Sequence, residues 1–163
     1  MKIRSTFEQG IYVIIILALA KDHRPIKSNA MSELLAVSDS YLKKILMKLS
    51  RRGLVVSSAS KRGGYTLSRK ADEISLKDVF DALEADQEVF TQSHYAEKLF
   101  PGQAHVKDAE EKIGQVIASG LSAFADRLGG LSISDLLLDG AWQNGAIDWD
   151  KRLEGRKNLN TKN

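Results

Sequence analysis

The side chains best suited to chemistry lie between positions 38 and 63, and they are hydroxyl and basic groups rather than thiols or paired carboxylates. Hydroxyl groups can hydrogen-bond to the edges of bases, and lysine and arginine can bind phosphate oxygens. This set therefore indicates recognition of a nucleic acid. The candidate residues are Ser38, Ser40, Tyr41, Lys43, Lys44, Lys48, Lys61, Arg62 and Gly63.

Several other kinds of chemistry lack the residues that they need. The chain has no cysteine, which excludes disulfides, thiolate metal sites and cysteine nucleophiles. The three histidines, His23, His94 and His105, do not have the spacing of metal ligands. No nucleophile motif such as G-x-S-x-G, no phosphate-binding loop and no pair of carboxylates stands out. We therefore expect no catalytic residue, no metal site, no cofactor and no enzymatic activity.

Three predicted helices must position the first candidates: residues 6–21, a short second helix at 28–36, and 38–52. In the third helix, Ser38 is the expected N-cap, and Gly53 ends the helix. Its apolar positions recur three and four residues apart, as on one face of a helix, and are Tyr41, Leu42, Ile45, Leu46 and Leu49. The lysines occupy the opposite face. Tyr41 is thus also a candidate core residue whose hydroxyl reaches water.

A predicted hairpin follows, with strands at 54–58 and 65–67 joined by a basic turn that contains two glycines. A further short helix is expected at 74–83. Helix, short helix, turn, basic helix and hairpin is the order of a winged helix-turn-helix. In that arrangement the start of the third helix enters the major groove, and its lysines flank phosphates. The hairpin tip, with Lys61 and Arg62, reaches the backbone or the minor groove.

The charge distribution agrees with a polyanion-binding first half. The first 83 residues hold 15 Lys/Arg and 8 Asp/Glu, whereas residues 84–150 hold 4 and 12. An acidic membrane surface is the competing polyanion, but the basic half lacks the exposed amphipathic helix that such binding needs. The pattern favours double-stranded DNA as the partner and no association with a membrane.

One segment imitates a secretory signal. Lys2 and Arg4 precede an apolar run at 11–20, which ends in Ala-Leu-Ala. Glu8 interrupts the approach, the run is too short to span a bilayer, and the winged helix needs it as a core helix. We therefore expect a buried helix in a cytoplasmic protein.

The second half is expected to hold a long helix at 106–128 with apolar residues at nearly coiled-coil spacing. The predicted dimer interface is Ile113, Val116, Ile117, Leu121, Phe124 and Leu128. A closing short helix is expected at 133–138. The predicted fold is mainly α: a winged helix-turn-helix at 1–84, a linker at 85–105, the dimerisation helix and closing helix at 106–138, and a polar, flexible tail at 139–163.

The chain resembles the Rrf2 family of bacterial regulators. The matching motifs are Met1-Lys2-Ile3, Gly10-Ile11, Leu17-Ala18-Leu19, Ser38-x-x-Tyr41-Leu42-x-x-Ile45-Leu46-x-x-Leu49, Gly53-Leu54-Val55, Gly63-Gly64-Tyr65-x-Leu67, Ile74-Ser75-Leu76-x-Asp78-Val79-x-x-Ala82-Leu83-Glu84 and Leu131-Ser132-Ile133-Ser134-Asp135-Leu136-Leu137. The resemblance implies a homodimer that crosses over through the long helix, so that two recognition helices bind a near-palindromic operator. It also implies a transcriptional regulator, with repression the expected mode.

The chain departs from that family in the linker. Many members carry three cysteines there that hold an iron–sulfur cluster, and this chain has none. Phe90, His94, Tyr95 and His105 occupy the same segment and are candidates for a small-molecule or protein effector site. The alternative, which we favour, is that they are linker residues packing on the long helix. A different function is also open: a protein-interaction or partner-dependent regulator that uses the winged-helix scaffold with little direct DNA specificity.

Overall fold

The computed structural model of the 163-residue chain describes residues 3–59, 63–84, 90–91, 93 and 95–160. The α-helices are α1 (Ser5–Ala18), α2 (Ser28–Leu35), α3 (Asp39–Arg51), α4 (Leu76–Glu84), α5 (Tyr95–Leu99), α6 (Ala104–Gly129) and α7 (Trp149–Asn160). The strands are β1 (Val55–Ser57) and β2 (Tyr65–Leu67). The helices and hairpin of the first half follow the predicted order, so the mainly helical, winged-helix fold class is confirmed.

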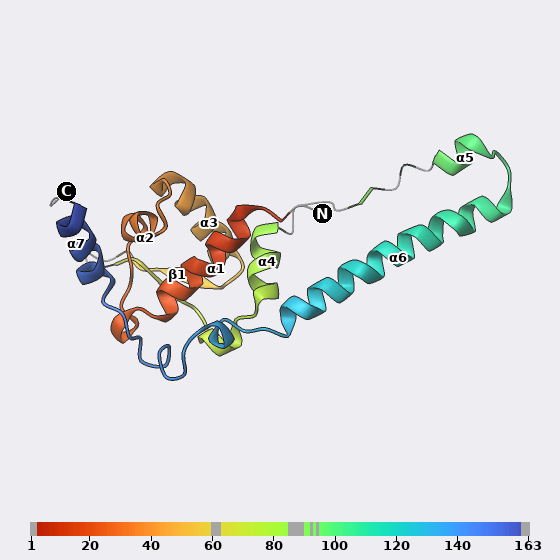
Figure 1. Cartoon of the computed structure of the whole chain (residues 1–163). Coiled ribbons are helices and arrows are strands. Elements are labelled where there is room, and N and C mark those ends of the chain that lie inside the picture. Colours follow the sequence, from red (N-terminus) through yellow and green to blue (C-terminus); the bar gives the residue numbers. More distant parts are fainter. Residues whose placement is uncertain (1–2, 60–62, 85–89, 92, 94, 161–163) are drawn as a thin grey trace.

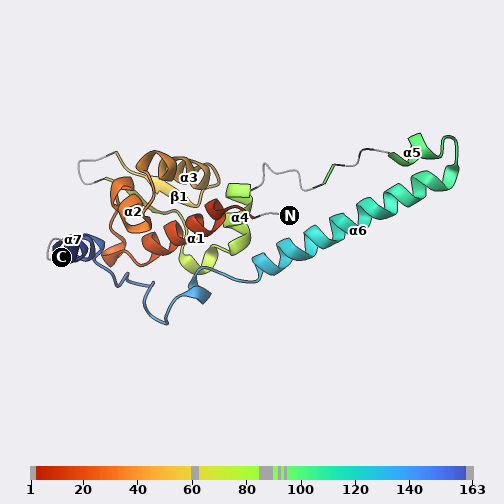
Figure 2. The same ribbon diagram turned by 45° about the horizontal axis from the view of Figure 1, so that its top comes forward.

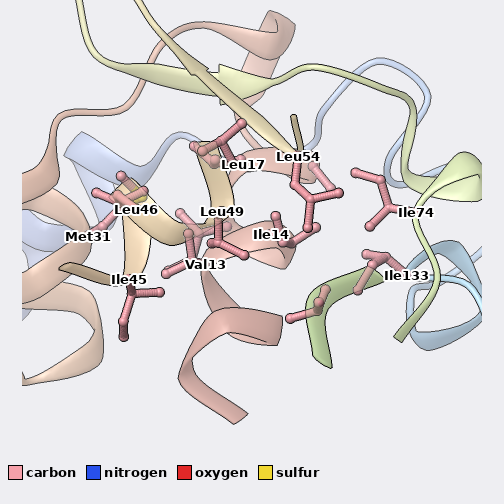
Figure 3. Packing of buried hydrophobic residues seen from close by; sticks show 14 of the residues in the cluster. Val13, Ile14, Leu17, Met31, Ile45, Leu46, Leu49, Leu54, Ile74 and Ile133 are labelled. Carbon is pink, nitrogen blue, oxygen red and sulfur yellow. The ribbon is translucent and has the colours of Figure 1, made fainter. Parts of the chain in front are cut away.

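Helix α1 runs through the centre of the globular part (Figure 1). It is apolar on nearly all sides, and Val13 and Ile14 are fully buried. Figure 3 shows them beside Ile45 and Leu49 of α3. The run that resembled a signal peptide is therefore the core helix that a winged helix requires. Among the described residues, no helix combines the length and apolar character needed to cross a membrane.

The wing is a two-stranded antiparallel hairpin that is fastened to the segment before α2. Val55 pairs with Leu67, and Ser57 pairs with Tyr65. Ile26 adds a third partner: its N–H donates to the Tyr65 carbonyl at 3.0 Å, and its carbonyl accepts the Tyr65 N–H at 2.8 Å. A Cβ on Gly64 would lie 2.6 Å from the Ile26 carbonyl oxygen, so only glycine permits this approach.

Helix α6 projects from the globular part as an arm, and α5 folds back on its far end, as both Figure 1 and Figure 2 show. At its near end α6 lies against α4. The segment that follows returns to the core: Ile133 is fully buried and its N–H donates to the Ile74 carbonyl at 2.8 Å. This closing segment contains only a short 3-10 turn at Ser134–Leu136, rather than the predicted helix at 133–138.

The predicted flexible tail at 139–163 is wrong for its described part, because residues 149–160 form α7. Trp149 is buried, and its indole Nε1–H donates to the Ile16 carbonyl at 2.8 Å. Leu153, one helical turn later, is buried as well, and Lys157 forms an ion pair with Glu33 of α2 at 3.1 Å. Two apolar residues one turn apart are enough to dock a helix whose remaining surface is polar.

Candidate nucleic-acid interface

The N-terminal end of α3 presents small polar side chains to solvent. Ser38 caps the helix, because its Oγ accepts the backbone N–H of Tyr41 at 3.3 Å. The hydroxyl of Ser40 lies 3.3 Å from that of Ser38, and both side chains are exposed. A cap of this kind fixes the first turn of the helix. The exposed hydroxyls are thus held at a rigid helix end, as contact with base edges requires.

Two predicted phosphate ligands, Lys43 and Lys44, are exposed on the same helix. The Lys43 ammonium forms an ion pair with Asp39 at 2.6 Å across one turn. The hydrogen bond between them lowers the pKa of Asp39 and raises the pKa of Lys43. Lys44 has no ion-pair partner within the described part of the chain, so its full positive charge faces solvent.

Tyr41 is turned inward. Its hydroxyl donates to the Gln9 side-chain oxygen at 2.9 Å and lies 3.0 Å from the Thr6 hydroxyl. Its ring is half-buried against the core. The hydroxyl therefore joins α3 to α1. The ring packs on the core, as in the alternative role of Tyr41, but the hydroxyl bonds to α1 rather than to water.

Lys48 is also turned away from the exposed face. Its ammonium donates to the Leu83 carbonyl at 3.2 Å, at the end of α4. Arg4 donates to the same carbonyl at 3.2 Å and forms an ion pair with Glu84 at 2.9 Å. Cations at a helix C-terminus meet carbonyl groups that have no partner within the helix. Lys48 thus links α3 to α4, and its role as a phosphate ligand stays a prediction.

The tip of the wing, with Lys61 and Arg62, lies outside the described residues. Gly63 at its base is buried. A hollow of about 660 Å³ beside it is lined in part by Lys27 and Asn29 at the start of α2. Both side chains are exposed, and the sequence analysis missed them as candidates. The available signal was the polar start of a second helix, whose N-terminal turn commonly meets the DNA backbone in helix-turn-helix proteins.

The six residues predicted to form a dimer interface fall into two groups. Ile113 and Val116 are 54% and 73% exposed on the projecting arm. Near the globular part, Phe124 instead packs edge-to-face on Phe80 of α4, with ring centroids 5.4 Å apart, and Leu128 packs on the core. Ile117 and Leu121 are half-buried.

Of the candidate effector residues, Tyr95 and His105 lie at the far end of the arm, where α5 and α6 begin. Phe90, Tyr95 and His105 are exposed, and His94 lies outside the described residues. Within the described part of the chain, no cluster of three or more histidine, aspartate and glutamate side chains could hold a metal ion.

Comparison with known proteins places the chain beside bacterial regulators. The family model of Rrf2, described as an iron-dependent transcriptional regulator, matches residues 3–139. The HTH-type transcriptional regulator YffB of Lactococcus lactis is 42% identical over 90 residues, which are 55% of this chain and 58% of that protein. YwgB of Bacillus subtilis, another HTH-type transcriptional regulator, is 33% identical over 64% of this chain and 67% of its own length. The match thus spans less than two thirds of the Lactococcus protein.

Among solved structures, the oxidised form of Staphylococcus aureus CymR matches 85% of this chain and 99% of its own, with 25% identity and a TM-score of 0.60. The iron named in the family description does not fit the residues present. Iron–sulfur clusters are held mainly by cysteine thiolates, and this chain has no cysteine.

Proposed function

The chain belongs to the Rrf2 family of transcriptional regulators, and we propose that it is a cytoplasmic homodimer that binds double-stranded DNA sequence-specifically and represses transcription. The family and the relatives named above are described as regulators, not as enzymes. The proposed operator is near-palindromic, because a two-fold symmetric dimer presents two identical recognition helices.

One observation carries the proposal: α3 buries one face completely and exposes a polar, basic face that starts at a capped N-terminus. Leu42, Ile45, Leu46 and Leu49 are buried, whereas Ser38, Ser40 and Lys44 are exposed. A recognition helix needs both faces, since the first fixes its orientation and the second reaches base edges and phosphates. Lys27 and Asn29 at the start of α2 extend the proposed phosphate contacts.

The proposal of a homodimer is supported by the exposed apolar side chains on the arm. Ile113 and Val116 leave large apolar surfaces in water on a single helix that projects from the domain. A second copy that packs its own α6 there would bury them, as apolar seams do in paired helices.

Fluorescence anisotropy with DNA from upstream of the chain's own gene, and with a shuffled duplex, tests the proposal. We expect the native duplex to bind about 10³-fold more tightly at near-physiological salt. Ser40→Ala should reduce the preference for the native duplex over the shuffled one, because it removes a hydroxyl that can hydrogen-bond to a base edge. Equal, weak and strongly salt-dependent binding of both duplexes would contradict direct sequence recognition of that operator.

A partner-dependent regulator is the second candidate function. Tyr95, Leu99 and Phe100 are 66%, 70% and 51% exposed at the far end of the arm, within the acidic half of the chain. Phe90, His94, Tyr95 and His105 are the proposed effector-binding residues. Exposed aromatic residues are typical of the centres of protein interfaces. Under this alternative, neutralising Lys44 leaves regulation intact, whereas Tyr95→Ser abolishes it.

A further inference from the structure

A second cavity lies between the end of α1, the base of the wing and the C-terminal extension, which is the chain from residue 140 to residue 160. Its volume is about 580 Å³, which is within the range of roughly 300–1,000 Å³ typical of small-molecule sites. Three parts of the chain that are far apart in sequence form it: the end of α1, the segment from β2 to the 3-10 turn at Ala71–Glu73, and residues 142–143. The last wall lies beyond residue 139, where the family match ends.

The floor of this cavity is apolar and the far wall is aromatic. Leu17, Ala18 and Ala71 are buried beneath it, and the half-buried indole of Trp142 stands at one side. An indole face beside aliphatic groups favours a flat apolar ligand, because aromatic rings stack with an offset on one another.

The rim carries positive charge that is only partly neutralised. Arg69 donates to the Glu73 carbonyl at 3.3 Å and lies 3.5 Å from the Asp78 carboxylate, so its charge is shared. Lys70 is exposed, and no carboxylate in the described part of the chain forms an ion pair with it. Glu73 is the acidic residue of the rim, and its carboxylate accepts the Lys70 backbone N–H at 3.2 Å. One unpaired ammonium beside one carboxylate favours a monoanion over a dianion.

The wall formed by the extension is firmly attached. The Leu19 carbonyl accepts the N–H groups of Ala146 and Ile147 at 3.1 and 2.8 Å, and the His23 ring nitrogen Nε2 lies 2.8 Å from the Gln143 carbonyl oxygen. Gly145 has φ +65°, and a Cβ there would lie 1.9 Å from the Ala20 carbonyl oxygen, so glycine is required.

The loop that receives this wall is strained. Asp22 and His23 both adopt positive φ, at 56° and 50°. Residues other than glycine seldom adopt this conformation. Where two adjacent residues do so, the surrounding structure holds them there, often at a binding site. Here the backbone N–H groups of Lys21 and Asp22 donate to the carbonyls of residues 147 and 144, which holds the loop against the wall beside the cavity.

From this geometry we propose that the cavity is an effector site for a small planar monocarboxylate. The ring lies on the floor of Leu17 and Ala71 against Trp142, and the carboxylate pairs with Lys70. Thr66 and Leu67 of β2 also line the cavity, so the ligand contacts the wing directly. Binding of the ligand is independent of the function proposed above, whereas its effect on DNA binding rests on that function.

The binding part is tested without DNA, on the full chain, with 2-naphthoate as the probe and its neutral amide as the matched control. Saturation-transfer NMR and thermal denaturation measure binding. We expect 2-naphthoate to bind and to raise the melting temperature, and acetate, which lacks a ring, to do neither. Lys70→Gln should weaken 2-naphthoate about tenfold and leave the amide unchanged, because it removes one charge-assisted hydrogen bond.

Trp142→Leu should weaken the binding of both 2-naphthoate and its amide. Lys112→Gln, at an exposed position on α6, should leave the affinity for both compounds unchanged. No binding of 2-naphthoate, or binding that Lys70→Gln and Trp142→Leu leave intact, overturns the site.

The effector role is tested separately by operator anisotropy with saturating 2-naphthoate. We expect at least a threefold change in operator affinity, which Lys70→Gln abolishes. An unchanged affinity in a chain that binds both probe and operator overturns the effector role alone.

Discussion

The ammonium of Lys48 on α3 donates a hydrogen bond to the carbonyl of Leu83 on α4, at 3.2 Å. This bond joins the candidate recognition helix to the last described turn before the linker, and Arg4 of the N-terminal segment donates to the same carbonyl. A lysine in a basic helix can therefore have a structural role, and substitutions along α3 should separate such a role from DNA binding.

Lys48→Ala should destabilise the fold. Hydrogen bonds that involve a charged group contribute about 1.5–3 kcal/mol, and the half-exposed position of Lys48 reduces this to about 1 kcal/mol. Urea denaturation measures the loss. The salt dependence of DNA binding should stay unchanged, and a slope reduced by one would show that Lys48 contacts a phosphate after all.

Lys44→Ala is the matched variant on the exposed face of the same helix. We expect stability within about 0.5 kcal/mol of the parent, because the side chain makes no described contact that would be lost. Affinity should fall for all sequences alike, and the slope of log K against log salt should fall in magnitude by about one. Anisotropy titrations over several salt concentrations provide the measurement, and an unaltered slope would remove Lys44 from the interface.

Val116→Asp should convert the proposed dimer to a monomer that stays helical, because this side chain is 73% exposed and has no role in the fold of its own chain. Sedimentation velocity measures the mass, and circular dichroism the helix content. A dimer that persists at micromolar concentration would contradict the placement of the interface on this face of α6.

Phe124→Ala should act differently, although it lies on the same helix. Its ring packs edge-to-face on Phe80, which packs in the same way on Phe7. We expect a loss of about 2 kcal/mol in the free energy of unfolding, below the value for a fully buried phenylalanine. Thermal or urea denaturation at fixed protein concentration checks this. A variant that dissociates without losing monomer stability would place Phe124 in the dimer interface instead.

Trp149→Ala should show that the C-terminal extension is part of the folded domain. Removing a buried tryptophan costs about 3–5 kcal/mol, and the Ile16 carbonyl would lose its indole donor. Glu154→Ala, at an exposed position of the same helix, serves as the control, with little change expected. If Trp149→Ala unfolded at the same urea concentration as the parent, α7 would not be docked in solution.

The start of α4 should make stability dependent on pH in the acid range. Burial alone raises the pKa of Asp78, but the backbone N–H and hydroxyl of Ser75, with Arg69, lower it overall below 3.8. A carboxyl whose pKa is lower in the folded state contributes stability above its unfolded pKa and loses it as the pH falls through the folded pKa. Asp78→Asn should therefore be less stable than the parent at neutral pH, by about 1 kcal/mol for a lost cap.

The stability difference between Asp78→Asn and the parent should shrink below about pH 4, where the parent carboxyl takes up its proton. Urea midpoints at a series of pH values measure it. A constant difference across that range would mean that the charge of Asp78 contributes nothing.

Much of the first half of the fold could be predicted from the sequence by itself. Periodicity, the cap at Ser38 and the turn glycines identify helices and hairpin because these signals act over a few neighbouring residues. The same local signals, together with the absence of cysteine, indicated a nucleic-acid-binding protein and excluded thiolate chemistry.

Only the tertiary structure decided which basic and aromatic residues of α3 face solvent. Tyr41 and Lys48 lie on the same helix as Ser40 and Lys44, yet they bond to Gln9 and Leu83, from α1 and α4. Helical spacing alone does not specify which neighbouring helix covers each side. Long side chains near the edge of the apolar stripe can turn either way, and the nearest unpaired backbone or side-chain group determines which way they turn.

The fold of the C-terminal extension could not be predicted from the sequence for a related reason. Polar and charged residues dominate 149–160, and only Trp149 and Leu153 are buried. Their docking depends on a carbonyl of Ile16 and a surface of α2 that lie more than a hundred residues earlier in the chain. Local composition does not specify contacts between such distant parts of the chain. Only the tertiary structure therefore shows how α7 docks and that a cavity lies beside Trp142.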